Sequence, residues 1–370
     1  MSWFAKKEFD GEGEPEKREN SFNRIITRCR YLRFSLNIAI GLFIFLLFRI
    51  IIFHTDFEVK LGQQIYLNGS KNVNIERTID VVMGSDDEYA QPSAATIASI
   101  LLNCDTSSRF RFHILDGGIS AEKKEKLKKL KELRNFEIKF YDMTKYAWSI
   151  FPNNREHVTL ATYYRLRIPE VLPKDIQKVL YLDGDVIVEQ DLKELWDTDI
   201  SDYVLGAVKE GIELGVRHDF NAGVLLLNLD KLRKINLLKD SLSYLEKNRG
   251  KIVYQDQDIL NGLFFNQYKD LSRKWNVTSN IYMPRNSSLV YANKEAEIAR
   301  KNPGIIHFSG GGFKPWNQEM LHPLSYEYWN YYKYTDFYSP EQRKSPIFRL
   351  ILLHISLIKQ TLNSVLNKFY

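Results

Sequence analysis

Cysteine is scarce in this chain of 370 residues, which contains only Cys29 and Cys104. Two thiols cannot form a disulfide framework or a thiolate cluster for zinc, so any bound metal would be held by oxygen and imidazole ligands. The sequence also lacks a nucleic-acid-binding motif and a long basic tract, and its net charge of +6 is modest for this length. We therefore expect no nucleic-acid partner.

The first 78 residues differ in composition from the rest. Residues 1–33 are charged and offer little apolar surface to bury, which is typical of a disordered tail. Residues 34–53 form a mostly apolar run, broken by Asn37 and Arg49, that is long enough to cross a bilayer because about 20 such residues suffice. No small-residue cleavage site follows, which argues against a removed signal peptide. We interpret this run as a transmembrane or membrane-embedded anchor, with a buried core helix as the alternative, and residues 54–78 as a linker.

Beyond residue 78, short apolar segments alternate with helix-like segments. The pattern predicts strands at residues 79–85, 110–116, 136–142 and 179–183, and a helix over residues 120–133 with Ser120 as its N-cap. Strands that alternate with helices form βαβ units. The sequence therefore indicates an α/β fold with a largely parallel sheet and a ligand at the carboxyl ends of its strands.

The C-terminal region, residues 321–370, begins with many aromatic residues and ends in a basic, amphipathic segment. From Ser345 onward it carries an apolar stripe with Arg349, Lys359 and Lys368, and no acidic residue follows Glu341. A basic amphipathic helix without acids is typical of attachment to an anionic membrane surface. A last helix packed on the core is the alternative.

Two carboxylates, Asp183 and Asp185, stand one residue apart between two apolar runs. In an extended backbone such residues project to the same side about 6.5–7 Å apart, so both could face one cavity and share a divalent cation. Asp-Gly between apolar runs is also a strong hairpin signal, with Gly184 accepting the positive φ of a tight turn. This segment alone leaves both interpretations open.

Four other segments carry chemically useful groups. A predicted strand ends at Gly84, Ser85, Asp86 and Glu88, where small residues admit a planar base and an acid can accept hydrogen bonds from a ribose. Arg165 follows on a predicted helix, and its guanidinium suits either a diphosphate or a surface salt bridge.

The remaining two segments would complete the same crevice. Asn221 enters a buried strand, and Asp256 with Gln257 opens a helix, so amides and a carboxylate could meet sugar hydroxyls. A later strand delivers His307, followed by three glycines and Lys314. Two carboxylates and one imidazole suit Mn²⁺ or Mg²⁺ better than zinc or copper, and phosphate oxygens would complete an octahedron.

The order of these segments resembles glycosyltransferase family 8 from residue 79 to residue 316. The matching stretches are VVMGSDDEY, FRFHILDGGIS, ATYYRLRIPE, KVLYLDGDVIVEQDLKELWDTDI, FNAGVLLLNL, YQDQDILNGLF and HFSGGGFKPW. The resemblance is strongest to the bacterial lipooligosaccharide and lipopolysaccharide α-galactosyltransferases and glucosyltransferases. It implies a GT-A fold for residues 79–320, Mn²⁺, a UDP-sugar donor and retention at the anomeric carbon.

The resemblance also implies a role for each matched position. Asp183, Asp185 and His307 would hold the metal. Gly84, Ser85, Asp86 and Glu88 would line the uridine site, Gly310 and Lys314 would hold the diphosphate, and Gly184 would leave room beside the nucleotide. Arg165, Asn221, Asp256 and Gln257 would contact the transferred sugar. Glu88 stands where the family members that the chain resembles carry an asparagine, and the glycine segment before Lys314 is one residue longer than theirs.

Together with the apolar run and the basic C-terminal segment, these roles predict a membrane-associated enzyme. The partners would be UDP-galactose or UDP-glucose, a glycan or glycolipid acceptor, and the membrane. Arginines precede the apolar run and acids follow it, so the positive-inside rule would place the bulk of the chain on the far side. Use of cytoplasmic nucleotide sugars instead favours a single-pass or monotopic bacterial protein with its catalytic domain in the cytoplasm. A lumenal type II topology is the alternative.

Two other functions stay open on the sequence alone. A metal-dependent phosphohydrolase of nucleotide sugars would also use paired aspartates, and a catalytically silent glycan-binding protein would keep the aromatic residues. Asn276-Val277-Thr278 is one of three triplets that match glycosylation acceptors, which often arise by chance.

Overall fold

The computed structural model describes residues 77–152, 159–210, 220–282, 294–316 and 322–339. The tail, the apolar run at residues 34–53 and the basic segment after Ser345 all lie outside these residues. Within the described part of the chain, no helix combines the length and the apolar character needed to span a bilayer. The first strand begins at Arg77, inside the segment expected to be a linker.

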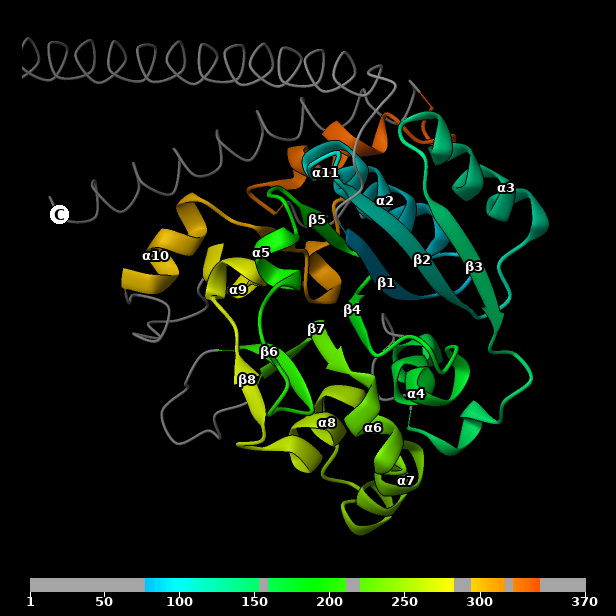
Figure 1. Ribbon diagram of the computed structural model, residues 1–370, viewed down its shortest axis with the longest axis vertical. Coiled ribbons are helices and arrows are strands. Elements are labelled where there is room, and N and C mark those ends of the chain that lie inside the picture. The colour runs from blue at the N-terminus through cyan, green and yellow to red at the C-terminus, as the bar shows by residue number, and fades with distance from the viewer. Residues whose placement is uncertain (1–76, 153–158, 211–219, 283–293, 317–321, 340–370) are drawn as a thin grey trace, which may run out of the picture. The chain divides into compact units, whose positions relative to one another are not determined.

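A seven-stranded sheet forms the centre of the described domain (Figure 1). Its strands, in spatial order, are β3 (Glu137–Asp142), β2 (Ser108–Asp116), β1 (Arg77–Ser85), β4 (Lys178–Leu182), β7 (Phe220–Asn228), β6 (Leu205–Lys209) and β8 (Tyr268–Asp270). β1, β2, β3 and β4 run parallel, whereas β7 is antiparallel to both β4 and β6. The four predicted strands and the α/β class are confirmed, in a sheet of mixed direction.

A second, three-stranded sheet pairs β5 (Val186–Val188) and β9 (Val277–Thr278) with the central strand β10 (Ile305–His307). β5 follows β4 closely in the chain, yet β4 pairs with β1 and β7 while β5 pairs antiparallel with β10. Residues 183–185 therefore connect two sheets. The hairpin interpretation of the Asp183 segment is wrong, because the two flanking strands do not pair with each other.

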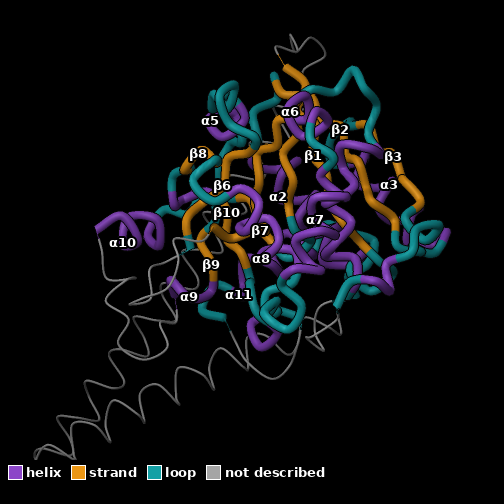
Figure 2. Tube along the Cα trace, turned by 90° about the horizontal axis from the view of Figure 1, so that it is seen from below, coloured by secondary structure: helices purple, strands orange, loops and turns teal. Residues whose placement is uncertain are grey.

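Helices cover both faces of the large sheet. Buried α2 (Ala90–Asn103) packs on β1, β5 and α11 (Ser325–Tyr332). The opposite face, which includes Val82, Leu115 and Leu225, packs against α4 (Ile168–Val171), α6 (Leu229–Lys234), α7 (Leu237–Lys247) and α8 (Asp256–Phe264). Figure 2 shows the strands inside and helices such as α3 (Ala121–Lys129) and α10 (Lys294–Lys301) at the periphery. Two short helices, α5 (Lys193–Trp196) and α9 (Ser279–Tyr282), complete the described part.

The helix expected at residues 120–133 differs in detail from the prediction. α3 ends at Lys129 and continues as a 3₁₀ turn, Leu130–Glu132. Ser120 occupies the N-cap position, but its hydroxyl makes no capping hydrogen bond. Its backbone N–H donates to Asp87 Oδ1 (2.9 Å), and Lys123 binds the same carboxylate (2.7 Å). Asp87 thus anchors the start of this helix to the loop after β1.

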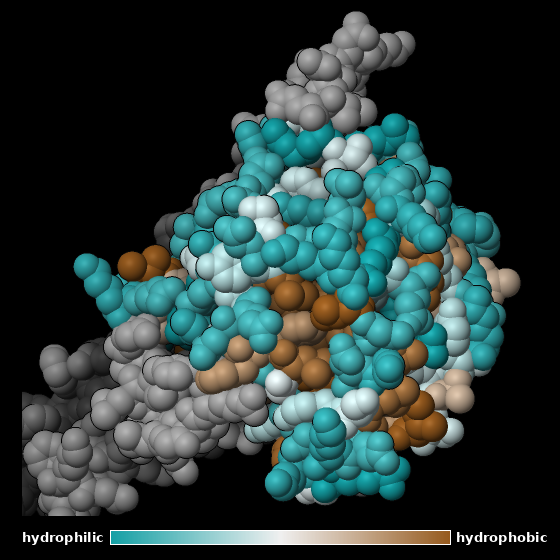
Figure 3. Space-filling model, turned by 60° about the horizontal axis from the view of Figure 1, so that its bottom comes forward, coloured by the Kyte–Doolittle hydropathy of each residue, from teal (hydrophilic) through white to brown (hydrophobic). Residues whose placement is uncertain are grey.

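Aromatic residues of α11 belong to the core. Tyr328, Tyr331 and Tyr332 are each at most 1% exposed, and Tyr328 contacts the ring of Trp316. The face drawn in Figure 3 is mostly hydrophilic around a central group of apolar side chains. The large apolar side chains that are exposed in the described residues are Ile150, Val253, Tyr254 and Ile298.

Candidate functional site

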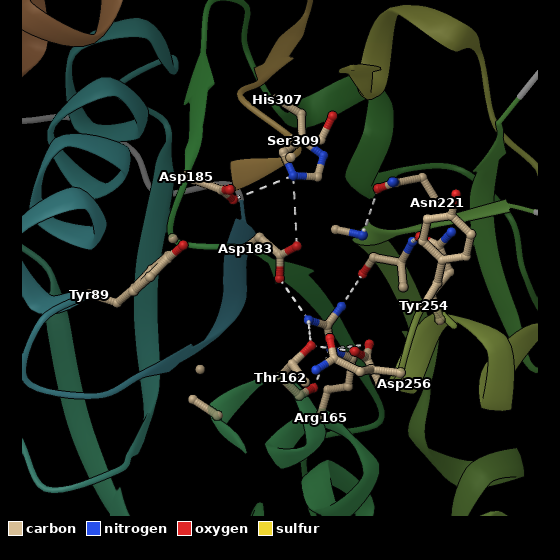
Figure 4. A pocket seen from close by; sticks show the side chains of 18 of the residues that line it. Tyr89, Thr162, Arg165, Asp183, Asp185, Asn221, Tyr254, Asp256, His307 and Ser309 are labelled. Carbon is tan, nitrogen blue, oxygen red and sulfur yellow. Dashed lines mark hydrogen bonds and ion pairs between the residues drawn. The ribbon is translucent and has the colours of Figure 1, made fainter. Parts of the chain in front are cut away.

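A cavity of about 760 Å³ lies where β1 and β4 end and the antiparallel β7 begins (Figure 4). This is the edge at which an α/β sheet binds ligands. Of the residues predicted for the site, those that line the cavity are Gly84, Arg165, Asp183, Gly184, Asp185, Asn221, Asp256, Gln257, His307, Gly310 and Lys314. Ser85, Asp86 and Glu88 do not line it.

Asp183, Asp185 and His307 form a cluster in this cavity. Their ligand atoms all lie within 4.8 Å of one another, with His307 Nε2 3.4 Å from Asp185 Oδ1 and 3.8 Å from Asp183 Oδ2. β4 delivers the first aspartate, the start of β5 the second, and β10 the histidine. Two carboxylates and one imidazole suit Mn²⁺ or Mg²⁺, so the residues present fit the cation that the sequence predicts.

Gly223 provides the space beside this cluster. A Cβ atom at this position would overlap the ring of His307 and lie 2.7 Å from Asp183 Oδ2. The backbone also holds Asp183, whose N–H donates to Gly223 O (2.8 Å). Gly184 is close to a different group, because a Cβ at this position would lie 2.7 Å from Ser93 Oγ on α2. Close packing of α2 therefore requires this glycine, in addition to any space it leaves for a nucleotide.

Arg165 joins the metal cluster to the opposite wall. The side chain, which is 5% exposed, lies on a 3₁₀ helix (Leu160–Arg167) and places Nη2 2.8 Å from Asp183 Oδ1 and Nε 3.0 Å from Asp256 Oδ2. Burial disfavours its charge, but the two carboxylates outweigh burial and raise the pKa of Arg165 above its usual range. The surface salt bridge left open by the sequence is wrong, since the arginine makes salt bridges that are buried in the cavity wall, and contact with a diphosphate stays a prediction.

Asp256 is a buried carboxylate at the first turn of α8. Its Oδ1 accepts a hydrogen bond from the Thr162 hydroxyl, while Oδ2 has no aligned donor although Arg165 Nε is near. Burial raises the pKa of Asp256 to about 6, against the lowering effect of Arg165 and Thr162. Asp256 lines the cavity, and its Oδ2 is a buried acceptor that is left without an aligned donor.

A strained turn directs Asp256 and Gln257 into the cavity. Gln255, just before α8, has φ +51° and ψ −122°, a conformation that non-glycine residues rarely adopt. Asp258 holds this turn by accepting the N–H groups of Val253 (2.6 Å) and Tyr254 (2.8 Å). Backbone strain of this kind concentrates at functional sites.

Lys314 contacts the metal cluster directly. Its ammonium is buried and hydrogen-bonds Asp185 Oδ2 and Phe308 O (2.9 Å). Burial disfavours both charges of this pair, yet their mutual attraction raises the pKa of Lys314 and, together with His307, lowers the pKa of Asp185. The lysine expected to meet a diphosphate is therefore positioned beside the proposed cation.

Two of the three residues outside the cavity, Ser85 and Asp86, support the loop after β1. Ser85 Oγ donates to Asp86 O (2.9 Å), and Asp86 Oδ1 accepts the N–H of Tyr89 (2.9 Å). Tyr89 itself lines the cavity, and burial raises its pKa to about 12. The sequence prediction placed weight on the acids of this loop, whereas the ring that follows them reaches the site.

Glu210 was also missed by sequence reasoning. It directly follows β6 and lines the cavity, where Oε2 accepts from Asn221 Nδ2 (3.2 Å) and Gln257 Nε2 (3.3 Å). Gln257 Oε1 in turn accepts the N–H of Ala222 (3.2 Å). An acid at the carboxyl end of a strand is a weak signal by itself, because its relevance depends on the neighbouring strand.

Comparisons with known proteins agree with this geometry. The family model described as glycosyl transferase family 8 matches residues 80–320. General stress protein A of Bacillus subtilis is 30% identical over 275 residues, which cover 70% of this chain and 95% of that protein. A lipopolysaccharide 1,2-glucosyltransferase of Escherichia coli is 25% identical over 287 residues, covering 74% and 82%. A crystal structure of the galactosyltransferase LgtC with donor and acceptor sugar analogs superposes with a TM-score of 0.61 at 30% identity, covering 72% of this chain and 100% of that one.

Proposed function

Because this chain belongs to glycosyltransferase family 8, we propose that it is a retaining hexosyltransferase that moves galactose or glucose from a UDP-sugar to a glycan or glycolipid. The observation that carries the proposal is the cluster of Asp183, Asp185 and His307, which faces the same cavity as Asp256 and Gln257. The glucosyltransferase and galactosyltransferase relatives support synthesis of lipopolysaccharide or another cell-surface glycan.

The metal cluster would bind Mn²⁺, with Mg²⁺ as a substitute. When bound, the cation supplies positive charge next to the diphosphate of the donor, where negative charge grows as UDP departs. Lys314 hydrogen-bonds Asp185 in the same cavity and adds a second positive charge next to the cation site. Tyr89, which lines the cavity, would border the nucleotide.

Asp256 and Arg165 would position the transferred hexose. Asp256 lines the cavity, where its carboxylate would accept a sugar hydroxyl, and Arg165 holds that carboxylate in place. Gln257 and Asn221, both anchored on Glu210, line the same wall and offer amide groups.

We infer a single displacement on one face of the sugar. Gln257 has no carboxylate to act as a nucleophile, and the carboxylate of Asp256 is engaged by Thr162 and Arg165. The bond from the anomeric carbon to the phosphate oxygen would break as the acceptor oxygen bonds on the same face. The acceptor proton would pass to the departing phosphate. A covalent sugar adduct on Asp256, found by mass spectrometry of the wild-type enzyme, would contradict this mechanism.

One assay tests the proposed activity. The full chain is incubated with UDP-galactose or UDP-glucose and Mn²⁺, with and without oligosaccharide acceptors, and products are identified by NMR. We expect UDP and an α-linked product, with transfer lost on chelation and in Asp183→Asn and Asp185→Asn. Release of inorganic phosphate or of sugar phosphate without glycosidic product would indicate a phosphohydrolase. Absence of any turnover with all acceptors would favour a binding protein.

Localisation is a separate proposal that depends on sequence segments outside the described residues. Residues 34–53 would anchor the enzyme in a membrane, and the basic segment after Ser345 would attach to anionic lipid, with the catalytic domain facing the cytoplasmic UDP-sugar. Deletion of residues 1–53 should shift the protein from the membrane fraction toward the soluble fraction. Protease protection of residues 77–339 in sealed cytoplasm-inside vesicles, with cleavage in inverted ones, would support this orientation, and the reverse pattern would contradict it.

A further inference from the structure

Asn276 lies directly behind the metal cluster, although no motif assigns it a function there. It ends the turn Arg273–Trp275 and precedes β9, whose residues pair with Ile306 and His307 of β10. The side chain is 1% exposed, so its amide is not available for glycosylation in the folded protein. Its Oδ1 lies 2.9 Å from His307 Nδ1, the ring nitrogen opposite the atom that faces the two aspartates.

A network of hydrogen bonds runs from His307 to Gly223 and Glu210. The direction of each bond in it follows from these last two groups, whose roles as donor and acceptor are fixed. Gly223 N–H can only donate, and it donates to Asn221 Oδ1 (2.9 Å). An ionised Glu210 carboxylate can only accept, and it accepts from Asn221 Nδ2 (3.2 Å). These two fixed partners determine which side of the Asn221 amide is oxygen and which is nitrogen.

The same logic continues to the histidine. Asn221 Oδ1 also lies 2.9 Å from Asn276 Nδ2, and two oxygens cannot hydrogen-bond, so Asn276 turns its NH₂ toward Asn221. Its oxygen then faces His307, and His307 Nδ1 must carry the proton that it donates. Nε2 is left with its lone pair toward Asp183 and Asp185, which is the state in which imidazole binds a metal.

We propose that Asn276 is a positioning residue for the metal site, which fixes the orientation and the Nδ1-protonated state of His307. A network that runs from Gly223 and Glu210 through two buried amides thus sets the chemistry of the ligand that β10 supplies. The inference rests on the proposed metal site, because it concerns how that site is held ready.

The first test measures Mn²⁺ binding without any substrate, by the electron paramagnetic resonance signal of free Mn²⁺. We expect the dissociation constant of Asn276→Ala to rise about 10–100-fold, as is usual when the hydrogen-bond partner of a ligating histidine is removed. Asn276→Asp keeps an acceptor for His307 Nδ1–H but turns its second oxygen toward Asn221 Oδ1, so we expect it to recover only part of the affinity that Asn276→Ala loses. Equal affinity of Asn276→Ala and wild type would overturn the inference.

Asn228→Ala is the matched control. Asn228 lies at the other end of β7 from Asn221, where its amide accepts from Lys231 N (3.1 Å) and donates to Ile200 O (3.3 Å). This variant loses two amide hydrogen bonds of similar kind far from the cluster, and its Mn²⁺ affinity should equal that of wild type. A loss as large as that of Asn276→Ala would mean that general loosening of the fold explains both results, which would also overturn the inference.

The second test needs no Asn276 variant. Histidine labelled with ¹⁵N in the wild-type chain reports by NMR which ring nitrogen carries a proton, and His307→Gln identifies the signal, with and without diamagnetic Mg²⁺. We expect a protonated Nδ1 in both samples; an unprotonated Nδ1 would refute the inference. If wild type binds no Mn²⁺, the proposed function fails, whereas binding by wild type and Asn276→Ala alike would refute only the role of Asn276.

Discussion

Replacing Asp256 by asparagine should stabilise the folded protein while it removes a sugar contact. Burial raises the pKa of Asp256 from 3.8 to about 6, so the ionised carboxylate is less favourable in the folded chain than in the unfolded chain. A shift of about 2 units corresponds to about 3 kcal/mol at neutral pH. Asparagine has nearly the same shape without the charge, so Asp256→Asn should avoid this cost.

The stabilisation of Asp256→Asn over wild type should increase with pH. The folded state binds a proton on Asp256 more tightly than the unfolded state does, so the cost is absent below pH 3.8, grows as pH rises toward 6, and is constant above. The excess unfolding free energy of Asp256→Asn over wild type should therefore be about 2 kcal/mol at pH 5 and about 3 kcal/mol at pH 7.

Urea unfolding of the metal-free chain at several pH values, followed by tryptophan fluorescence, measures this difference. Asp87→Asn is a control of opposite sign, because the Lys123 hydrogen bond lowers the pKa of Asp87 to about 2. The ionised Asp87 carboxylate adds its full stabilisation to the folded state above about pH 3.8, so Asp87→Asn should be slightly less stable than wild type by an amount that is constant from pH 5 to pH 7. If Asp256→Asn is less stable than wild type at pH 7, or if the difference is independent of pH, the reasoning is refuted.

Three further predictions concern the metal cluster. Asp185→Asn should destabilise the metal-free protein by about 3–5 kcal/mol in thermal or urea unfolding, because the buried ammonium of Lys314 loses its partner, and the double variant with Lys314→Met should regain most of this loss. A double variant as unstable as the single one would contradict that account. Gly223→Ala should weaken Mn²⁺ binding at least about tenfold, since a Cβ displaces the ring of His307, whereas Gly250→Ala, at an open position with φ +80°, should leave Mn²⁺ affinity unchanged. Equal affinities would show that the cluster tolerates the methyl group. Removal of metal by chelation should lower the melting temperature of the loaded enzyme, because bound Mn²⁺ at 100 times its dissociation constant adds about 2.7 kcal/mol; an unchanged melting temperature would argue against a folded-state metal site.

The strands of this domain follow from local sequence, and so does part of the site. Short apolar runs ending in small or acidic residues predicted β1 and β4 within two residues, because buried strands of a parallel sheet are apolar throughout. Asp183 and Asp185 stood out for the same reason, as carboxylates directly after such a run. The choice between a hairpin and a ligand site could not be made locally, since it depends on β5 pairing with β10.

The residues that were missed depend on tertiary contacts. Glu210 matters only because β7 lies beside β6 and brings Asn221 against it. Asn276 attracted notice only as part of a triplet that matches a glycosylation acceptor, and its burial accompanies the pairing of β9 with a strand almost 30 residues later in the chain. Tyr89 was one residue beyond the acids that drew attention. Sequence patterns report which segments become strands, whereas the partners of a polar side chain are decided by which strands become neighbours.

The connection of two sheets through residues 183–185 also constrains how the protein can be synthesised. Asp185 and its partner Lys314 are 129 residues apart in the sequence, and His307 lies close to the later of the two. A ribosome therefore delivers Asp185 long before the lysine that balances its charge, whereas Arg165, the partner of Asp183, is already present. We expect nascent chains that end before β10 to carry an uncompensated Asp185 carboxylate and to gain a cation site only when the small sheet closes, so that metal retention reports completed synthesis of the domain.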